Sequence, residues 1–154
     1  MRVVLQRVKS ASVSVHGNVS GAIGAGLLVF AAIHDNDSSQ DIEYIADKII
    51  NMRIFADDNG RFDRSLREVD GSLLVVSQFT LYADTRRGRR PSFTGSASSV
   101  IAWPLFSDFI SKLESFNIIV ETGKFGEMME IQLVNDGPVT IIVDSNDRHM
   151  PRHY

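Results

Sequence analysis

The segment SQFT, residues 77–80, holds the polar side chains best placed to do chemistry in this chain. Ser77, Gln78 and Thr80 interrupt an apolar run, LLVVSQFTLY, whose composition otherwise predicts a strand over 73–82. A polar group that is buried without a partner costs a few kcal/mol, so each of these side chains needs a neighbouring backbone group or a ligand. Local hydrogen bonds are one interpretation, and a pocket at the end of the strand is the other.

A hydroxyl nucleophile at Ser77 or Thr80 would need a general base and a group that orients this base. The sequence supports neither, because no G-x-S-x-G motif is present and every histidine lies outside the segment. The four histidines are at positions 16, 34, 149 and 153. The chain also has no cysteine and no H-E-x-x-H pattern, so we expect no metal site.

A second segment, NDGPVT at 135–140, separates two runs that are typical of strands, MMEIQLVN and VTIIVD. Pro138 cannot donate an N–H to a sheet and Gly137 has no side chain to pack, so a turn is the ordinary interpretation. The alternative is that these two residues present their backbone carbonyls to a ligand. The local sequence does not decide between the two.

A third segment, RRGRRP at 86–91, places Arg86, Arg87, Arg89 and Arg90 around one glycine. Guanidinium groups bind phosphate oxygens bidentately, so such a loop beside a pocket would position a polyanion without recognising its sequence. A solvated basic loop is an equally ordinary interpretation.

Short strands and two helices are expected around these segments. Apolar residues recur at helical spacing from Ile42 to Met52, and a second helix is expected over roughly 104–116, with Pro104 in its first turn. Strands are expected at 2–8, 11–17, 26–33, 53–57 and 73–82, and in the apolar runs near the C-terminus. A hairpin turn is expected at HGN, 16–18, and the continuous apolar run at 26–33 is typical of a strand buried on both faces. The pattern predicts a single α+β domain whose mixed sheet is curled or barrel-like.

Composition is that of an ordinary globular protein: 154 residues, of which 44% are hydrophobic and 23% charged. No apolar run is long enough to cross a bilayer and no signal peptide is evident, so we expect a cytoplasmic location and no membrane partner. The net charge of −3 gives no global attraction to DNA or RNA, and any nucleic-acid contact must be local. The polar tail, 145–154, is expected to be mobile.

Together, SQFTL at 77–81 and LVNDGPVT at 133–140 closely resemble the two signature segments of the D-aminoacyl-tRNA deacylases. Smaller matches to this family are LQRV at 5–8, RIF-D at 53–57 and RGxRPSF at 87–93. The resemblance covers residues 1–144. It implies a homodimeric hydrolase, with no cofactor, that cleaves D-amino acids from the acceptor end of tRNA. The chain departs from the family at RFDRS, after the DDNG turn, and in its tail.

The resemblance implies that Gly137 and Pro138 are joined by a cis bond and enter the pocket of the partner subunit as a chiral filter, with Arg7 holding this segment. Glycine lets a ligand approach the backbone closely. An L-residue would meet that backbone with its side chain, so it is rejected by exclusion. Glycine bears hydrogen on both sides of its Cα, so glycyl-tRNA is expected to be a substrate.

The opposite wall of the pocket, by the same resemblance, consists of Ser77, Gln78, Phe79 and Thr80. Backbone N–H groups near these residues are expected to hold the oxyanion. The ribose 2′-hydroxyl of the terminal adenosine would help to activate water; attack by the Thr80 hydroxyl is the alternative. The resemblance also implies that two side chains flank the adenine, those of Phe125 and Met129.

Two functions of other classes stay open at this point. One is a non-catalytic protein that binds RNA ends through the arginine loop. The other is an esterase with a threonine nucleophile that acts on small esters lacking RNA.

Overall fold

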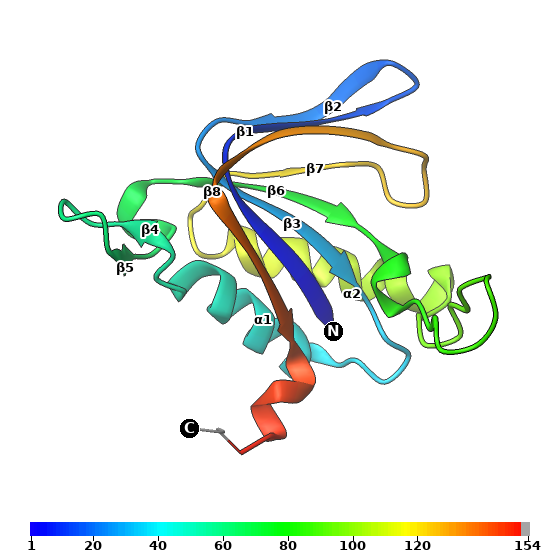
Figure 1. Ribbon diagram of the computed structural model, residues 1–154. Coiled ribbons are helices and arrows are strands. Elements are labelled where there is room, and N and C mark those ends of the chain that lie inside the picture. Colours follow the sequence, from blue (N-terminus) through cyan, green and yellow to red (C-terminus); the bar gives the residue numbers. More distant parts are fainter. Residues whose placement is uncertain (152–154) are drawn as a thin grey trace.

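The computed structural model describes residues 1–151, which form eight strands, two α-helices and three 3₁₀ helices (Figure 1). The strands are β1 (Arg2–Val15), β2 (Asn18–Ile23), β3 (Gly26–Ala32), β4 (Phe55–Ala56), β5 (Phe62–Arg64), β6 (Ser72–Ser77), β7 (Val120–Thr122) and β8 (Glu130–Asp144). The helices are α1 (Ser39–Asn51), α2 (Ser99–Glu114), and the 3₁₀ helices η1 (Arg67–Val69), η2 (Phe79–Tyr82) and η3 (Ser145–His149). Within the described part of the chain, no helix is long and apolar enough to span a membrane.

Strand β1 pairs with three neighbours, and these pairings organise the sheet. Its first half pairs with β3 and its second half with β2, while β8 runs antiparallel to it along most of its length. From β3 the sheet continues in parallel pairings through β6 to β7. The two ends of this path meet, because the Ser20 hydroxyl of β2 donates to the Thr122 carbonyl of β7 at 3.3 Å. The predicted α+β domain with a curled, barrel-like mixed sheet is confirmed.

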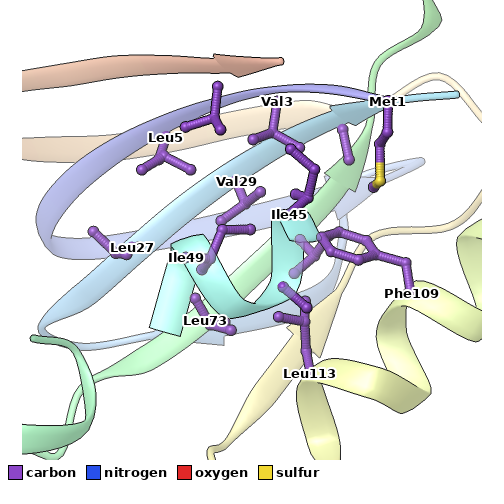
Figure 2. Packing of buried hydrophobic residues seen from close by; sticks show 14 of the residues in the cluster. Met1, Val3, Leu5, Leu27, Val29, Ile45, Ile49, Leu73, Phe109 and Leu113 are labelled. Atoms are coloured by element: carbon purple, nitrogen blue, oxygen red, sulfur yellow. The ribbon is translucent and has the colours of Figure 1, made fainter. Parts of the chain in front are cut away.

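The sheet is buried on both faces where β3 and β6 lie side by side. Alternate residues of β3 enter two clusters: Leu27 and Val29 pack towards the helices, whereas Leu28 packs on the opposite face. Figure 2 shows Ile45 of α1 and Phe109 of α2 among the residues of the helix-side cluster. Both helices therefore cover the same face of the sheet (Figure 1). The strand predicted from the continuous apolar run at 26–33 is confirmed.

The two strands predicted at 2–8 and 11–17 are one continuous strand, β1. The hairpin turn that follows it lies where the sequence predicts one. His16 and Gly17 both have positive φ angles, 50° and 77°, as a two-residue hairpin turn of the primed type requires.

The strand predicted over 73–82 is wrong at its C-terminal end. Strand β6 stops at Ser77, and the chain then turns into η2. The last residue pair between the two parallel strands joins Ala31 and Ser77, because β3 ends at the next residue. The N–H of Gln78 still donates to the Ala31 carbonyl at 2.8 Å, and beyond this bond the ladder does not continue.

The second helix begins earlier than predicted, at Ser99, with Ser98 as its N-cap residue. Pro104 therefore lies inside α2 and not in its first turn. A proline at this position has no N–H for the carbonyl of Val100, four residues earlier. Both residues are exposed, so water can satisfy the carbonyl that the helix leaves unpaired. Local sequence misplaced the helix start because Pro104 looks like a start signal.

The start of the predicted mobile tail is packed against the domain, contrary to the expectation. Ser145 is fully buried in η3, where its hydroxyl accepts a hydrogen bond from the α-amino group of Met1 at 2.7 Å. Arg148 lies 3.2 Å from the Asp41 carboxylate. Burial raises the pKa of Asp41, but hydrogen bonds with Ser145 and Ser38 outweigh this effect and lower the pKa to about 2. Residues 152–154 of the tail lie outside the described residues.

Replacing Pro104 with alanine is expected to stabilise the protein. The Pro104→Ala variant restores an N–H to the helix and removes a ring that crowds the preceding turn, so the free energy of unfolding should rise by about 1–3 kcal/mol. Urea denaturation measures this value. The exposed Asp108→Ala change in α2 is the matched control and should stay within about 0.5 kcal/mol of the original protein. A fall in stability of Pro104→Ala would contradict this account of the helix.

Candidate active site

A cavity of about 610 Å³ opens at the carboxyl ends of the parallel strands β3 and β6. The carboxyl ends of parallel strands are a common place for ligand sites. Its walls come from these strand ends, from η2, from the N-terminal end of α2 and from the segment before β8. The residues predicted from sequence that line it are Ser77, Gln78, Phe79, Thr80, Phe125 and Met129. The structure therefore brings together two segments that are almost fifty residues apart.

The polar side chains of the SQFT segment are partly satisfied within the protein. The Gln78 side chain donates from Nε2 to the Thr80 hydroxyl, which supports the interpretation of local hydrogen bonds. The Gln78 N–H is occupied by the Ala31 carbonyl. The next two N–H groups, of Phe79 and Thr80, begin a 3₁₀ helix, and among residues 1–151 they have no hydrogen-bond acceptor. Two adjacent residues that line the cavity, Phe79 and Thr80, thus have N–H groups without an acceptor in the described chain, whereas the N–H of Gln78 is already bonded.

No described histidine is hydrogen-bonded to Ser77 or Thr80. His34 packs edge-on against Tyr82, with 5.4 Å between ring centroids, and its Nδ1 accepts from the Asn36 N–H at 3.2 Å. Among the described residues, the one carboxylate on the cavity wall belongs to Glu127, which is half-exposed and lies 3.7 Å from His16 Nε2. Residues 1–151 therefore place hydrogen-bond donors on the lining segments and form no Ser-His-Asp triad there.

Phe125 is held in place by aromatic neighbours from α2. Its ring centroid lies 5.2 Å from that of Trp103 and 5.6 Å from that of Phe106. Phe106 is buried, whereas Trp103 is half-exposed. Met129 packs closely against Gly123, because a Cβ at that glycine would lie only 2.4 Å from the Met129 Sδ. Phe125 and Met129 thus form an apolar wall suited to a flat ring.

Gly137 and Pro138 lie within one long strand, β8, and are joined by a cis peptide bond. The ordinary interpretation of this segment, a turn between two separate strands, is therefore wrong. The pairing of β1 with β8 jumps from Gln6–Thr140 to Val8–Asn135, so four residues of β8 bulge opposite Arg7 alone. Gly137 and Pro138 are exposed at this bulge, and neither lines the cavity of their own chain.

Arg7 holds the start of the bulge through its contacts with Asp136. Its Nε donates to the Asp136 carbonyl at 2.9 Å and lies 3.3 Å from the Asp136 carboxylate. Its Nη1 donates to the carbonyl of Ile54, and its guanidinium lies 5.2 Å from the centroid of the Phe62 ring. The side chain is buried, so these contacts fix the backbone just before Gly137.

Asn135 closes the bulge from within, and sequence reasoning missed this role. Its Oδ1 accepts from the Val139 N–H at 2.9 Å, and its Nδ2 donates to the Val139 carbonyl at 3.1 Å. The side-chain amide thereby makes the two hydrogen bonds that the backbone of a neighbouring strand would make, and it links the two ends of the bulge. An asparagine four residues before the last residue of the bulge was the only signal, and asparagine is common in turns for other reasons.

The arginine loop is closed by backbone hydrogen bonds of 2.7 and 2.9 Å between Asp84 and Ser92. Arg86 forms a bidentate ion pair with Asp84, at 2.9 and 2.7 Å. Hydrogen bonds from Arg86 lower the pKa of Asp84, and the same contact raises the pKa of Arg86. The other arginines of the loop are exposed, and no ion pair involves them within residues 1–151: Arg87, Arg89 and Arg90.

Comparison with known proteins gives consistent matches over nearly the whole chain. The family model described as D-Tyr-tRNA(Tyr) deacylase matches residues 4–144. D-aminoacyl-tRNA deacylases of Chloroflexus aurantiacus and Roseiflexus castenholzii are each 54% identical, over 99% of this chain and over 95% and 98% of their own lengths. The enzyme of that name from Thermosipho africanus is 52% identical over 94% of this chain and 97% of its own length.

Two solved structures have the same fold. One is titled c-Myc DNA Unwinding Element Binding Protein: its TM-score is 0.88 at 34% identity, covering 94% of this chain and 98% of that one. The other is described as a probable eukaryotic D-amino acid tRNA deacylase, with a TM-score of 0.81 at 18% identity, covering 92% and 97%.

Removing the Asn135 amide is expected to loosen the bulge. In Asn135→Ala both hydrogen bonds to Val139 are lost, so the free energy of unfolding should fall by about 1–3 kcal/mol. Exchange of the Val139 amide hydrogen should accelerate by at least about tenfold, as measured by NMR. Gln132→Ala, an exposed change in the same strand, is the control and should leave this exchange rate unchanged. Unaltered Val139 exchange in Asn135→Ala would show that the amide does not close the loop.

Proposed function

Because this chain belongs to the D-aminoacyl-tRNA deacylase family, we propose that it hydrolyses the ester between a D-amino acid and the terminal adenosine of tRNA. Enzymes of this family are ester hydrolases, and the chain is one of them. The observation that carries the proposal is one cavity lined on one side by Phe79 and Thr80, whose N–H groups have no acceptor among residues 1–151, and on another by Phe125 and Met129. The products are free tRNA and the D-amino acid, and a cytoplasmic location belongs to the same proposal.

The terminal adenosine packs against Phe125 and Met129 in this proposal. Phe125 is supported from behind by α2, so it presents a firm apolar surface to a base. The ester carbonyl then faces the N–H groups of Phe79 and Thr80. These donors stabilise the negative charge that develops when water adds to the carbonyl carbon.

The reaction itself requires only water and the substrate. Water attacks the ester carbon as the 2′-hydroxyl oxygen of the ribose takes up one of its protons, and the 2′-hydroxyl passes its own proton to the 3′-oxygen when the ester bond to that oxygen breaks. The RNA assists here because no described side chain near Thr80 forms the base–nucleophile pair that an esterase would use. Orientation and oxyanion binding can suffice for an activated ester.

Chirality is selected by Gly137 and Pro138 of a second copy of the chain, which completes the cavity as a homodimer. Their exposure at the bulge, away from their own cavity, supports this arrangement. An L-residue would direct its side chain at this backbone and be excluded, whereas a D-residue would present hydrogen. Arg7 and Asn135 hold the bulge in position for that role.

The arginine loop supplies electrostatic affinity for the tRNA backbone. Arg87, Arg89 and Arg90 are exposed cations suited to phosphate contacts, whereas Arg86 is already paired with Asp84. These contacts position the acceptor end and carry no sequence information.

A nucleic-acid-binding protein without catalytic activity is the second candidate, and the likeness to the c-Myc DNA Unwinding Element Binding Protein favours it. Incubation of the purified protein with D-Tyr-tRNA and L-Tyr-tRNA separates the two. Release of D-tyrosine with L-Tyr-tRNA left intact supports the deacylase. Binding of both without release of either amino acid supports the second candidate.

The Thr80→Ala variant is expected to retain activity within about threefold, because the backbone N–H of residue 80 persists and no nucleophile is lost. A nucleophilic Thr80 predicts instead a loss of roughly 10³-fold or more. Rates of D-Tyr-tRNA deacylation under single-turnover conditions distinguish the two outcomes. Thr80→Ser is the matched control that keeps the hydroxyl, and circular dichroism checks the fold of both variants.

Glu127→Gln should likewise remain active in the same assay, since no step uses the Glu127 carboxylate.

Glycyl-tRNA is expected to be cleaved and L-alanyl-tRNA to be spared. The two substrates differ by one methyl group on the Cα side that the backbone filter occupies, so steric exclusion rejects only the second. D-Alanyl-tRNA is the positive control. The measurement is the amount of aminoacyl-tRNA that remains over time at increasing enzyme concentration. Inertness towards glycyl-tRNA while D-alanyl-tRNA is consumed would contradict exclusion by backbone alone.

A further inference from the structure

A second groove, of about 570 Å³, lies between α2 and the segment that follows β7. Phe125 lines both this groove and the candidate active site. Helix α2 also borders both, with Ala102 on the cavity and Trp103 and Ser107 on the groove. The rise along the helix from Ala102 to Ser107, five residues further on, is about 7.5 Å. The groove therefore continues directly from the wall on which the terminal adenosine is proposed to lie.

Trp103 is a partly exposed aromatic residue that lines this groove. It is the single tryptophan of the chain, it is 52% exposed, and its ring packs at 56° against that of Phe125. A large aromatic ring left half-exposed beside a cavity is a usual platform for an unpaired nucleobase, because every base can stack on it. Its neighbour Phe125 is already the proposed platform for the terminal base.

The polar groups at the rim fit a nucleotide as well. Lys124 is exposed and forms no ion pair among residues 1–151, so its charge is free for a phosphate. The opposite wall carries the hydroxyl of Ser111 and the carboxylate of Glu114, which can accept hydrogen bonds from the exocyclic amino group of a base.

We propose that this groove binds the nucleotide that precedes the terminal adenosine of tRNA, with its base stacked on Trp103 and its phosphate near Lys124. This inference rests on the proposed function, because the occupant is assigned from the continuity of the groove with the adenosine wall. Two stacking residues of one aromatic cluster would then hold two successive bases of the single-stranded acceptor end.

Tryptophan fluorescence tests the binding directly, since Trp103 is the sole source of this signal. The dinucleotide cytidylyl-adenosine should quench the fluorescence saturably, whereas adenosine alone should change it little. Lys124→Gln should weaken binding of the dinucleotide and make it less dependent on salt. Equal responses to adenosine and the dinucleotide would overturn the proposal. The proposal would also be overturned if the fluorescence changed with protein concentration but did not respond to the dinucleotide. A second copy of the chain would then cover the groove.

Kinetics separates this inference from the proposed function. In Trp103→Ala, kcat/KM for D-Tyr-tRNA should fall roughly 5- to 150-fold through a rise in KM, as expected for the loss of one stacked base. Activity on 3′-O-(D-tyrosyl)adenosine, which lacks the preceding nucleotide, should fall far less, because the buried Phe106 still packs against Phe125 in this variant. Trp103→Phe should recover most of the loss, and Val100→Ala, at an exposed position of α2, is the control without effect.

The possible failures are distinct. Equal losses on both substrates would mean that Trp103 only supports Phe125, and no loss on either would mean that the groove is not used; both overturn the inference. Failure of the proposed function would instead appear as inactivity of the unaltered protein towards D-Tyr-tRNA.

Discussion

A single buried cation sets the geometry of the exposed bulge in β8. Arg7 is only 9% exposed, and its guanidinium donates to carbonyls of two segments far apart in the chain, at Ile54 and Asp136. A buried charge is costly unless it is paired and hydrogen-bonded, so the groups that accept hydrogen bonds from this guanidinium must keep their positions. The backbone at Asp136 is therefore fixed, and the amide of Asn135 fixes Val139 on the other side. Gly137 and Pro138 can stand exposed without becoming mobile because both ends of their short loop are tied.

The candidate active site depends on a second constraint, the unequal length of neighbouring strands. Strand β3 ends at Ala32, so β6 has no partner beyond Ser77 and the chain turns into η2. The start of this 3₁₀ helix leaves the N–H groups of Phe79 and Thr80 without acceptors in the described chain. The Ala97 N–H donates to the Ile33 carbonyl at 2.9 Å and so brings the start of α2 to the same place. The end of a sheet ladder thus creates the donors that the proposed oxyanion contact requires.

The sequence predicted what periodicity and local turn chemistry control. The two-faced burial of 26–33, the turn at His16 and Gly17 and the helix before Met52 all follow from residues close in sequence. Two of the failures have a different cause. Where β6 ends depends on the length of β3, and where β8 bulges depends on its pairing with β1, neither of which a local window contains. The signature segments were identified by resemblance, but Asn135 stood in one of them without a role until its contacts were seen.

The arrangement proposed for catalysis divides recognition between side chains and backbone for a physical reason. The parts that all substrates of such an enzyme share are the adenosine, the ester and the Cα hydrogen, whereas the amino-acid side chain varies. Side chains at Phe125 and Met129 suit the constant base, and backbone groups at Phe79, Thr80 and Gly137 suit the constant ester and Cα. A main-chain contact makes no demand on the identity of the variable group, so it can reject one enantiomer without choosing among amino acids. If the bulge of a second copy supplies that contact, adenosine binding and ester hydrolysis belong to the single chain, while chiral selection is a property of the assembled dimer.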